Sequence, residues 1–192
     1  MSFAAAVDPQ VSAGACPHMA VVLGSARELL AVLVSFYALG ASRGGWVVHH
    51  ALPGERDRDR ARLTGGGLDV AGLEETGSLV LFEFDPAESP EDSAERFEPL
   101  LAAALGRGHS ALWYSRFPIG PGASNFASAT PYDRAWDARF RGRPVVTLCP
   151  YVLAGDEADE RVDYLASWHD AVLDADGGVR RSARAWDDGA HP

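Results

Sequence analysis

The chain has 192 residues, of which 47% are apolar and 23% charged, a composition typical of a globular domain with one sizeable core. Its formal net charge of −10 comes from 27 acidic side chains against 17 basic ones, a balance that repels a phosphate backbone and excludes direct nucleic-acid binding as an expected role. All basic residues are arginine, so a P-loop lysine, a Schiff-base lysine and a lysine general base are excluded as well.

The cysteines and the apolar segments indicate where the protein resides. Cys16 and Cys149 lie in unrelated contexts, which is not the pattern of a disulfide framework. Residues 1–15 contain no basic residue before their apolar patch, unlike a secretory signal. The longest apolar stretch, residues 29–41, falls short of the roughly 20 residues that span a bilayer. We therefore expect a cytoplasmic protein with no membrane segment.

The first half of the chain predicts strands alternating with helices. Residues 18–23 form a short apolar run that predicts a strand, and Ser25 and Glu28 have the spacing of a capping box at the start of a buried helix. Residues 46–52 predict the second strand. The run at 55–62 places opposite charges three positions apart, which indicates an exposed helix with a solvated face.

The second half continues this alternation. Ser89 and Thr130 each precede a proline and predict the start of a helix, and the helix after Thr130 carries an aromatic stripe that includes Trp136. The remaining predicted elements are strands at 78–84, 111–117 and 144–152, a final long helix at 156–173 and an edge strand within 179–186.

This alternation predicts an α/β fold, a three-layer sandwich with a mostly parallel central sheet and helices on both faces. We expect one domain over residues 17–186, flanked by loosely ordered tails at 1–16 and 187–192. Ligands of such sheets bind outside the carboxyl ends of the strands, so the pocket is expected there.

Several polar residues lie near the predicted strand ends and are candidates for a site. Glu83 and Asp85 resemble metal-binding acids after a strand, but a strand end that turns into a loop is the favoured interpretation. His49 and His50 are adjacent on a strand and point to opposite faces, so they cannot readily share one ion, and one buried and one exposed histidine is expected. No metal and no cofactor is expected.

Cys149 and His169 form the one conceivable nucleophilic pair, because a thiolate needs a nearby base. The spacing of His169, however, places it on an apolar helical stripe with Val162 and Leu165, where a histidine is usually a hydrogen-bonded core residue. Cys149 alone is usually a small buried hydrophobe. A non-enzymatic role is therefore favoured, with an enzyme that uses this pair as the alternative.

The order of short motifs after the His18 strand resembles the MEDS family, a sensory domain of methanogens and methylotrophs named after a dichloromethane-responsive regulator. The segments that carry this resemblance are Phe36–Gly45, Gly67–Val70, Thr76–Leu79, Tyr132–Asp133, Thr147–Tyr151 and Leu165–His169.

The resemblance implies a RecA-like sandwich without the ATPase loop, which senses small molecules, with hydrocarbon derivatives as candidates, for transcription or signal transduction. It also implies a set of ligand-binding residues: His18, Tyr132, Cys149, Tyr151 and His169. The output then requires a separate regulatory protein, and a homo-oligomer is compatible with the sequence. A third interpretation is an interaction module that binds a regulator through the aromatic helix around Trp136.

Overall fold

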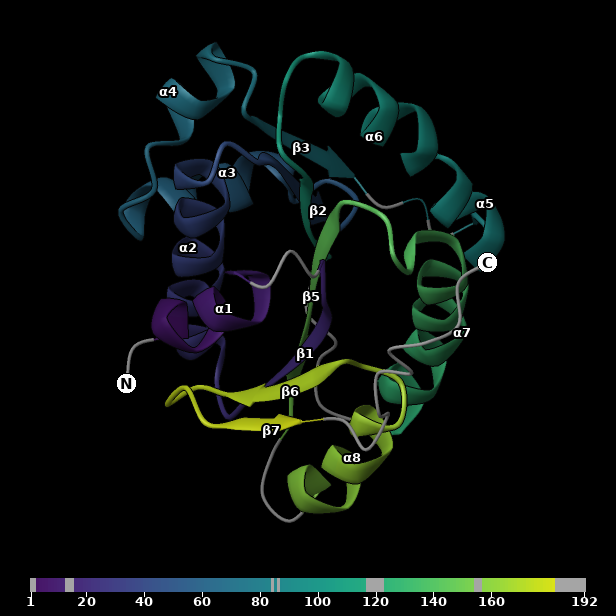
Figure 1. The fold of residues 1–192 in the computed structure, drawn as a ribbon. Helices are drawn as coiled ribbons and strands as arrows, with labels where there is room; N and C mark the ends of the chain where they lie inside the picture. The colour runs from purple at the N-terminus through teal and green to yellow at the C-terminus, as the bar shows by residue number, and fades with distance from the viewer. Residues whose placement is uncertain are drawn as a thin grey trace.

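The computed structural model describes residues 3–12, 16–83, 85, 87–116, 123–153 and 157–181. Seven strands form a single sheet with the order β3-β2-β4-β5-β1-β6-β7 (Figure 1). The first six run parallel to their neighbours, and β7 is antiparallel to β6. The strands are β1 (His18–Leu23), β2 (Trp46–Ala51), β3 (Leu79–Glu83), β4 (Leu112–Arg116), β5 (Val145–Val152), β6 (Ala171–Asp174) and β7 (Val179–Arg181).

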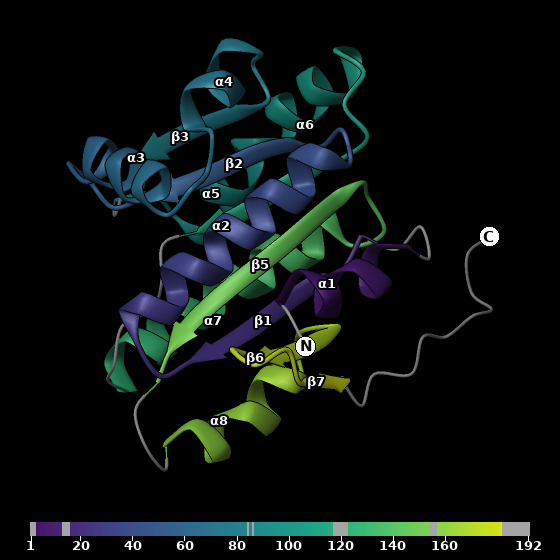
Figure 2. The ribbon, with the colours of Figure 1, turned by 90° about the vertical axis from the view of Figure 1, so that its left-hand side faces the viewer.

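Helices cover both faces of the sheet, which confirms the predicted three-layer α/β sandwich. Figure 2 shows α2 in front of the sheet and α7 behind it. The first face carries α1 (Phe3–Ser12), α2 (Ala26–Ser42), α3 (Arg56–Gly65) and α4 (Val70–Glu75). The second face carries α5 (Pro90–Glu95), α6 (Phe97–Gly106), α7 (Ala123–Phe140) and α8 (Glu157–Ala166).

The two faces hold separate apolar cores, because alternate residues of each strand point to opposite sides. On the first face Phe36 and Trp113 pack together, with ring centroids 5.1 Å apart. On the second face Trp136 stacks on Tyr114 at 4.1 Å and its indole N–H donates to the Thr147 hydroxyl. Trp136 is therefore a residue of the second core.

Both His49 and His50 are buried, so the prediction that one of them is exposed was wrong. The reason is that β2 lies inside the sheet, between β3 and β4, and both of its faces are covered. Their side chains do point to opposite faces. His49 contacts the hydroxyl of Tyr37 at 2.7 Å on the first face, and His50 contacts the hydroxyl of Tyr114 at 2.9 Å on the second.

The predicted helix at 156–173 was correct only in its first half. Helix α8 ends at Ala166, a turn follows, and residues 171–174 form strand β6, which pairs in parallel with β1. His169 thus lies in the turn between them and not on a helical stripe. The short run from Ala171 to Leu173 is buried against β1, a partner that residues near in sequence do not reveal.

Two other boundaries differ from those expected. The N-terminal stretch, predicted to be loosely ordered, contains α1, whose Phe3 and Val7 side chains lie one helical turn apart and are buried in the first core. Helix α7 begins at Ala123 and includes Thr130 and Pro131, which were expected to mark its start. The predicted tail at 187–192 lies outside the described residues.

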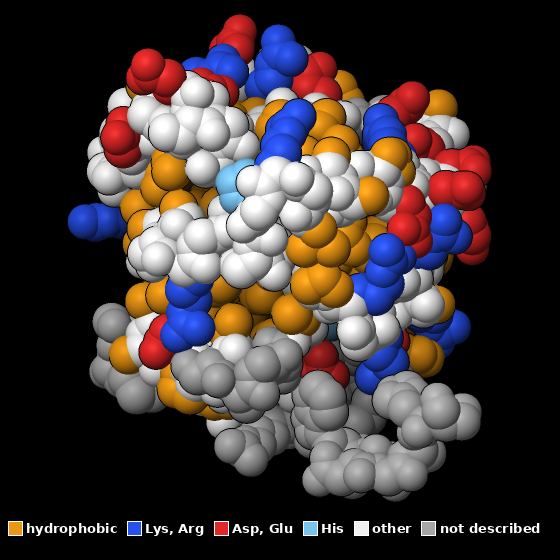
Figure 3. Space-filling model, turned by 45° about the horizontal axis from the view of Figure 1, so that its top comes forward, with side chains coloured by type: hydrophobic (Ala, Val, Ile, Leu, Met, Phe, Trp, Pro, Cys, Tyr) orange, Lys and Arg blue, Asp and Glu red, His pale blue; other side chains and the backbone are white. Residues whose placement is uncertain are grey.

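The surface is strongly charged. Figure 3 shows acidic and arginine side chains interspersed around one face, with apolar side chains between them. On α3 the predicted pairs form: Arg58 contacts Glu55 at 2.7 Å, and Arg62 contacts Asp59 at 3.0 Å. Within the described ranges, none of the helices is long and apolar enough to cross a bilayer.

Candidate functional site

A cluster of buried polar side chains lies on the second face of the sheet, beneath α7 and α8. His18 opens β1, and Cys149 and Tyr151 follow each other on one face of β5. Asp133 comes from the inner side of α7, and His169 comes from the turn before β6. All five are at least 90% buried, so four separate elements bring ionisable groups into the interior of the protein. We call these five residues the polar cluster.

The sheet register determines which strand residues reach the polar cluster. In the parallel pairing of β1 with β5, His18 lies opposite Thr147 and Ala20 lies opposite Cys149. Residues two apart on a strand share a face, so His18, Cys149 and Tyr151 all project toward α7. The start of β1 is held to the turn by the backbone N–H of His18, which donates to the Asp170 carboxylate at 2.8 Å.

Cys149 is in contact with two members of the polar cluster. Its Sγ lies 3.3 Å from Nε2 of His18, and the thiol donates to Oδ1 of Asp133 at 3.4 Å. Nε2 of His18 and Oδ1 of Asp133 are 4.0 Å apart. The other carboxylate oxygen of Asp133 accepts a hydrogen bond from the hydroxyl of Tyr151. Thus one oxygen of Asp133 faces the thiol while the other is oriented by a phenol.

The two histidines are oriented by groups on their far sides. Nδ1 of His169 lies 2.9 Å from the carbonyl oxygen of Leu165. A carbonyl only accepts, so Nδ1 carries the proton and the neutral ring presents the lone pair of Nε2. The rings of His18 and His169 are 4.4 Å apart. The two rings are therefore close enough to contact the same bound group.

Asp137, one helical turn after Asp133 on α7, stands behind His18. Its Oδ1 is 3.6 Å from Nδ1 of His18, and Arg141 binds it from the solvent side at 2.6 Å. Burial favours the neutral form of Asp137, but hydrogen bonds from His18 and Arg141 outweigh burial and hold its pKa well below the ordinary value. Asp137 thus places a fixed negative charge behind the His18 ring.

The chemistry available here is that of a compact donor set. His18, Asp133, Cys149 and His169 each offer one ligand atom, and these four atoms lie within 4.8 Å of one another. A thiol, two imidazoles and a carboxylate are the groups that hold transition-metal ions in proteins. Cys149 and His18 also have the arrangement of a thiol next to a base. The sequence analysis had expected His169 as the base for Cys149.

Four of the five residues predicted to bind a ligand come together in the polar cluster: His18, Cys149, Tyr151 and His169. Tyr132 does not join them, because its hydroxyl donates to the backbone carbonyl of Glu88 at 2.9 Å, before α5. The cluster extends from His18 and His169, at the amino ends of β1 and β6, to Tyr151 near the carboxyl end of β5, so it lies across one face of the sheet and not outside the strand ends, where the pocket was expected. Strand β6 was not recognised in the sequence, so this position could not be predicted.

Asp133 is the member of the polar cluster that the sequence analysis missed. In the sequence it stood out only as part of the Tyr132–Asp133 segment of the family resemblance, without a role of its own. Within α7 it lies on the buried stripe of Ala129, Trp136 and Phe140, with the three-and-four spacing of a core-facing helix side. The position of an acidic residue on such an apolar stripe was the signal that could have identified Asp133 as a site residue.

The site does not include the other candidates. Glu83 and Asp85 are exposed, and Asp85 accepts the backbone N–H of Ala87 at 2.9 Å, the local turn that was the favoured interpretation. At the loop between β1 and α2, Glu28 accepts the backbone N–H of Gly24 at 2.8 Å. A carboxylate therefore occupies the place where a P-loop would hold phosphate.

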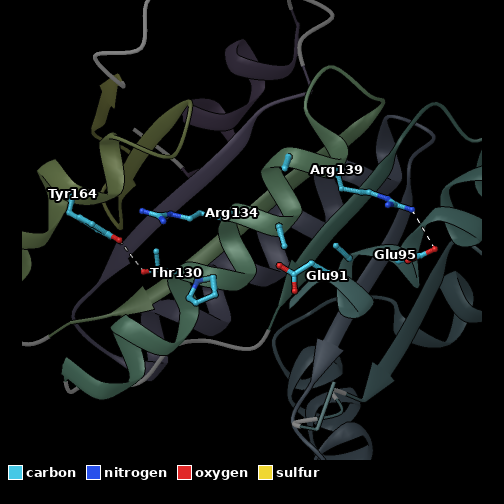
Figure 4. A pocket seen from close by; sticks show the side chains of 10 residues that line it. Glu91, Glu95, Thr130, Arg134, Arg139 and Tyr164 are labelled. Carbon is cyan, nitrogen blue, oxygen red and sulfur yellow. Dashed lines mark hydrogen bonds and ion pairs between the residues drawn. The ribbon is translucent and has the colours of Figure 1, made fainter. Parts of the chain in front are cut away.

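A groove of about 810 Å³ lies on the outer side of α7, between α5 and α8 (Figure 4). Arg134 and Arg139 project from α7 along it, and Tyr164 closes one side from α8. Its lining contains none of the five predicted ligand-binding residues. Arg134 also lies over the ring of Trp168 at 4.1 Å, next to His169, so α7 has the groove on one side and the polar cluster on the other.

The family model of the MEthanogen/methylotroph, DcmR Sensory domain (MEDS) matches residues 17–172, which is most of the chain and includes every member of the polar cluster. The chain belongs to the MEDS family. The resemblance noted in the sequence is thereby confirmed. A search of curated proteins gave no match.

The fold of this MEDS domain is similar to that of a KaiC-like protein from the hyperthermophilic archaeon Pyrococcus horikoshii OT3. The two superpose with a TM-score of 0.55 at 14% identity, over 83% of this chain and 71% of the other. At that identity the likeness concerns the fold alone. It confirms the predicted RecA-like architecture of this MEDS domain.

Proposed function

We propose that this MEDS domain is a non-catalytic sensory domain that binds a small molecule at the polar cluster and passes the signal to a separate transcriptional or signalling regulator in the cytoplasm. Membership of a sensory family supports this general role. The observation that carries the assignment to a site is the convergence of His18, Asp133, Cys149 and His169 inside the protein. Buried polar groups are costly unless partnered, so such a concentration usually has a function.

The burial of the polar cluster favours sensing over turnover. His169 and Cys149 are 1% and 2% exposed, so a ligand reaches them only when the elements above them move. That movement couples binding to a change in α7 or in the turn before β6, the coupling that a sensory domain needs. An enzyme would instead need repeated access of substrate to the thiol.

The test is a thermal-shift screen of the full chain against small apolar and halogenated one-carbon and two-carbon compounds. A ligand at about 100 times its Kd stabilises by roughly 2.7 kcal/mol, which corresponds to a rise in Tm of roughly 5–10 °C for a chain of this size. We expect at least one compound to raise the Tm of the wild-type protein and of Cys16→Ala, but not that of Cys149→Ala. A screen with no such compound would count against the proposal.

The close approach of Cys149 to His18, at 3.3 Å with Asp137 behind the ring, keeps a thiol enzyme as a second candidate. It predicts turnover of a small ester or thioester by the purified protein and its complete loss in Cys149→Ala. That result would replace the sensory proposal.

A further inference from the structure

We propose that His18, Asp133, Cys149 and His169 bind one divalent transition-metal ion of the zinc class, and that this ion is the resident group of the polar cluster. The proposal rests on the proposed function, because it names what the sensory site holds. It departs from the expectation, made from the sequence, that no metal is bound. Four observations lead to it.

The spacing of the ligand atoms is the first. Zinc bonds of roughly 2.0–2.3 Å at tetrahedral angles place neighbouring ligand atoms about 3.3–3.6 Å apart. The distances from Sγ of Cys149 are 3.3 Å to Nε2 of His18 and 3.4 Å to Oδ1 of Asp133. The third edge, from His18 to Asp133, is 4.0 Å. Small side-chain shifts therefore suffice for these three atoms and a ring nitrogen of His169 to coordinate one ion.

The second observation is the balance of charge. Asp133 and a Cys149 thiolate would place two negative charges about 3.4 Å apart in the interior, each nearly removed from water. Such a pair is strongly unfavourable without a cation between its members, so without a metal the thiol keeps its proton and donates to Asp133, as in this structure. A doubly charged ion neutralises both when the thiol proton is released to solvent on binding.

The third observation is that the groups behind the ligands already have the arrangement of an outer shell. Metal-binding histidines usually donate their other N–H to a carbonyl or carboxylate, which fixes the ring. His169 does so to Leu165, and His18 has Asp137 at 3.6 Å. Tyr151 holds the second oxygen of Asp133. Three of the four ligands, His18, Asp133 and His169, therefore have a polar group behind them.

The fourth observation is the kind of donor. Magnesium and calcium prefer sites made of oxygen atoms, whereas a thiolate with imidazoles suits zinc and its neighbours among the transition metals. Four protein ligands leave a tetrahedral ion without an open position, as in structural zinc sites and unlike catalytic ones. A closed coordination sphere agrees with a non-catalytic role for the ion.

The experiment uses the full chain, purified without added chelator, and begins with its metal content. We expect close to one equivalent of bound zinc-class metal. The protein is then stripped with a chelator and titrated with Co²⁺ as the spectroscopic probe. A tetrahedral site with a thiolate gives visible ligand-field bands and a near-ultraviolet charge-transfer band from sulfur to cobalt.

Two matched pairs of variants assign the site. Cys149→Ser removes the charge-transfer band, whereas Cys16→Ser, at the other cysteine, leaves it unchanged. Tyr151→Phe keeps all four ligands but loses the hydroxyl behind Asp133, and we expect Co²⁺ affinity to fall by roughly 10–100-fold with the spectrum retained. Tyr164→Phe, in the groove, leaves the affinity unchanged. Tyr151→Phe thus tests the site even if Cys149→Ser does not fold.

The proposal is overturned if the wild-type protein carries no metal and shows no sulfur-to-cobalt band, or if Cys149→Ser keeps that band. These outcomes are distinct from failure of the sensory function. If a compound raises the Tm in the screen but no metal binds, only the metal proposal is rejected. If a metal binds but no compound raises the Tm, only the small-molecule proposal is rejected.

Discussion

At the scale of single residues, the protein stabilises its buried polar groups by pairing them across elements. His49 is an example outside the polar cluster: it lies between the hydroxyl of Tyr37, at 2.7 Å, and the carboxylate of Asp59 on α3, at 3.1 Å. Burial raises the pKa of Tyr37 well above its ordinary value, so the phenol remains a hydrogen-bond donor. The chain from Tyr37 to Asp59 ties α2, β2 and α3 together.

Asp59 makes this chain sensitive to acid. Burial opposes ionisation of Asp59, but His49 and Arg62 outweigh burial and lower its pKa from the ordinary value of about 3.8. A carboxyl group with a lowered folded-state pKa stabilises the protein above its unfolded-state pKa, and this stability is lost as pH falls through the folded-state value. We expect the free energy of unfolding to decrease below about pH 4.

The measurement is urea denaturation across the acid range for the wild-type protein, Asp59→Asn and Asp57→Asn. Asp59→Asn is expected to flatten part of the acid-dependent loss. Asp57 is 83% exposed, so Asp57→Asn should follow the wild-type curve. Equal curves for all three proteins would show that the Asp59 contact contributes nothing to acid sensitivity.

At the scale of elements, α2 approaches β4 so closely at Gly40 that this position leaves no room for a side chain. A Cβ atom built on Gly40 would lie 2.6 Å from Cδ2 of Trp113, a ring that is itself buried. Overpacking of this kind costs roughly 1–3 kcal/mol. We therefore expect Gly40→Ala to lower the free energy of unfolding by about that amount.

Gly65 is the matched control, because it is also helical, at the end of α3, and a Cβ there meets nothing within 4 Å. Gly65→Ala should be neutral or stabilising by up to roughly 1 kcal/mol, since alanine has the higher helix propensity. Both variants are compared by urea denaturation. If Gly40→Ala is as stable as Gly65→Ala, Trp113 moves more readily than its packing indicates.

The elements also show how far the sequence predicts the structure. The alternation of strands and helices and the Ser25 cap could be read directly, because periodicity and capping are local signals; Ser25 does accept the backbone N–H of Glu28. Strand β6 could not be predicted in this way, because a run of four residues fits both the helical and the strand period. Only its pairing with β1 determines that it forms a strand.

The polar cluster shows the same limit. Short motifs of the family identified four members of the cluster: His18, Cys149, Tyr151 and His169. Tyr132 was predicted but lies outside the cluster, whereas its neighbour Asp133 was not predicted and belongs to it. One helical step separates the side of α7 that faces Glu88 from the side that faces Cys149. That step depends on the phase of the helix, and α7 begins seven residues before the predicted start at Thr130.

At the scale of the whole molecule, the RecA-like architecture persists without a P-loop lysine. The first loop has no lysine, and Glu28 caps Gly24 where phosphate oxygens would lie. A carboxylate there repels phosphate. We expect millimolar Mg·ATP to leave the Tm unchanged and the purified protein to release no phosphate from ATP. A rise in Tm with Mg·ATP, or hydrolysis by the wild-type protein that persists through further purification, would contradict this prediction.

The contact between β1 and the turn before β6 joins parts of the chain that are far apart in sequence. His18 and Asp170 are 152 positions apart in the sequence, yet they touch where β1 meets the turn before β6. A group bound by both His18 and His169 would be a second link at this junction, and it would connect the first strand of the domain to the turn before β6.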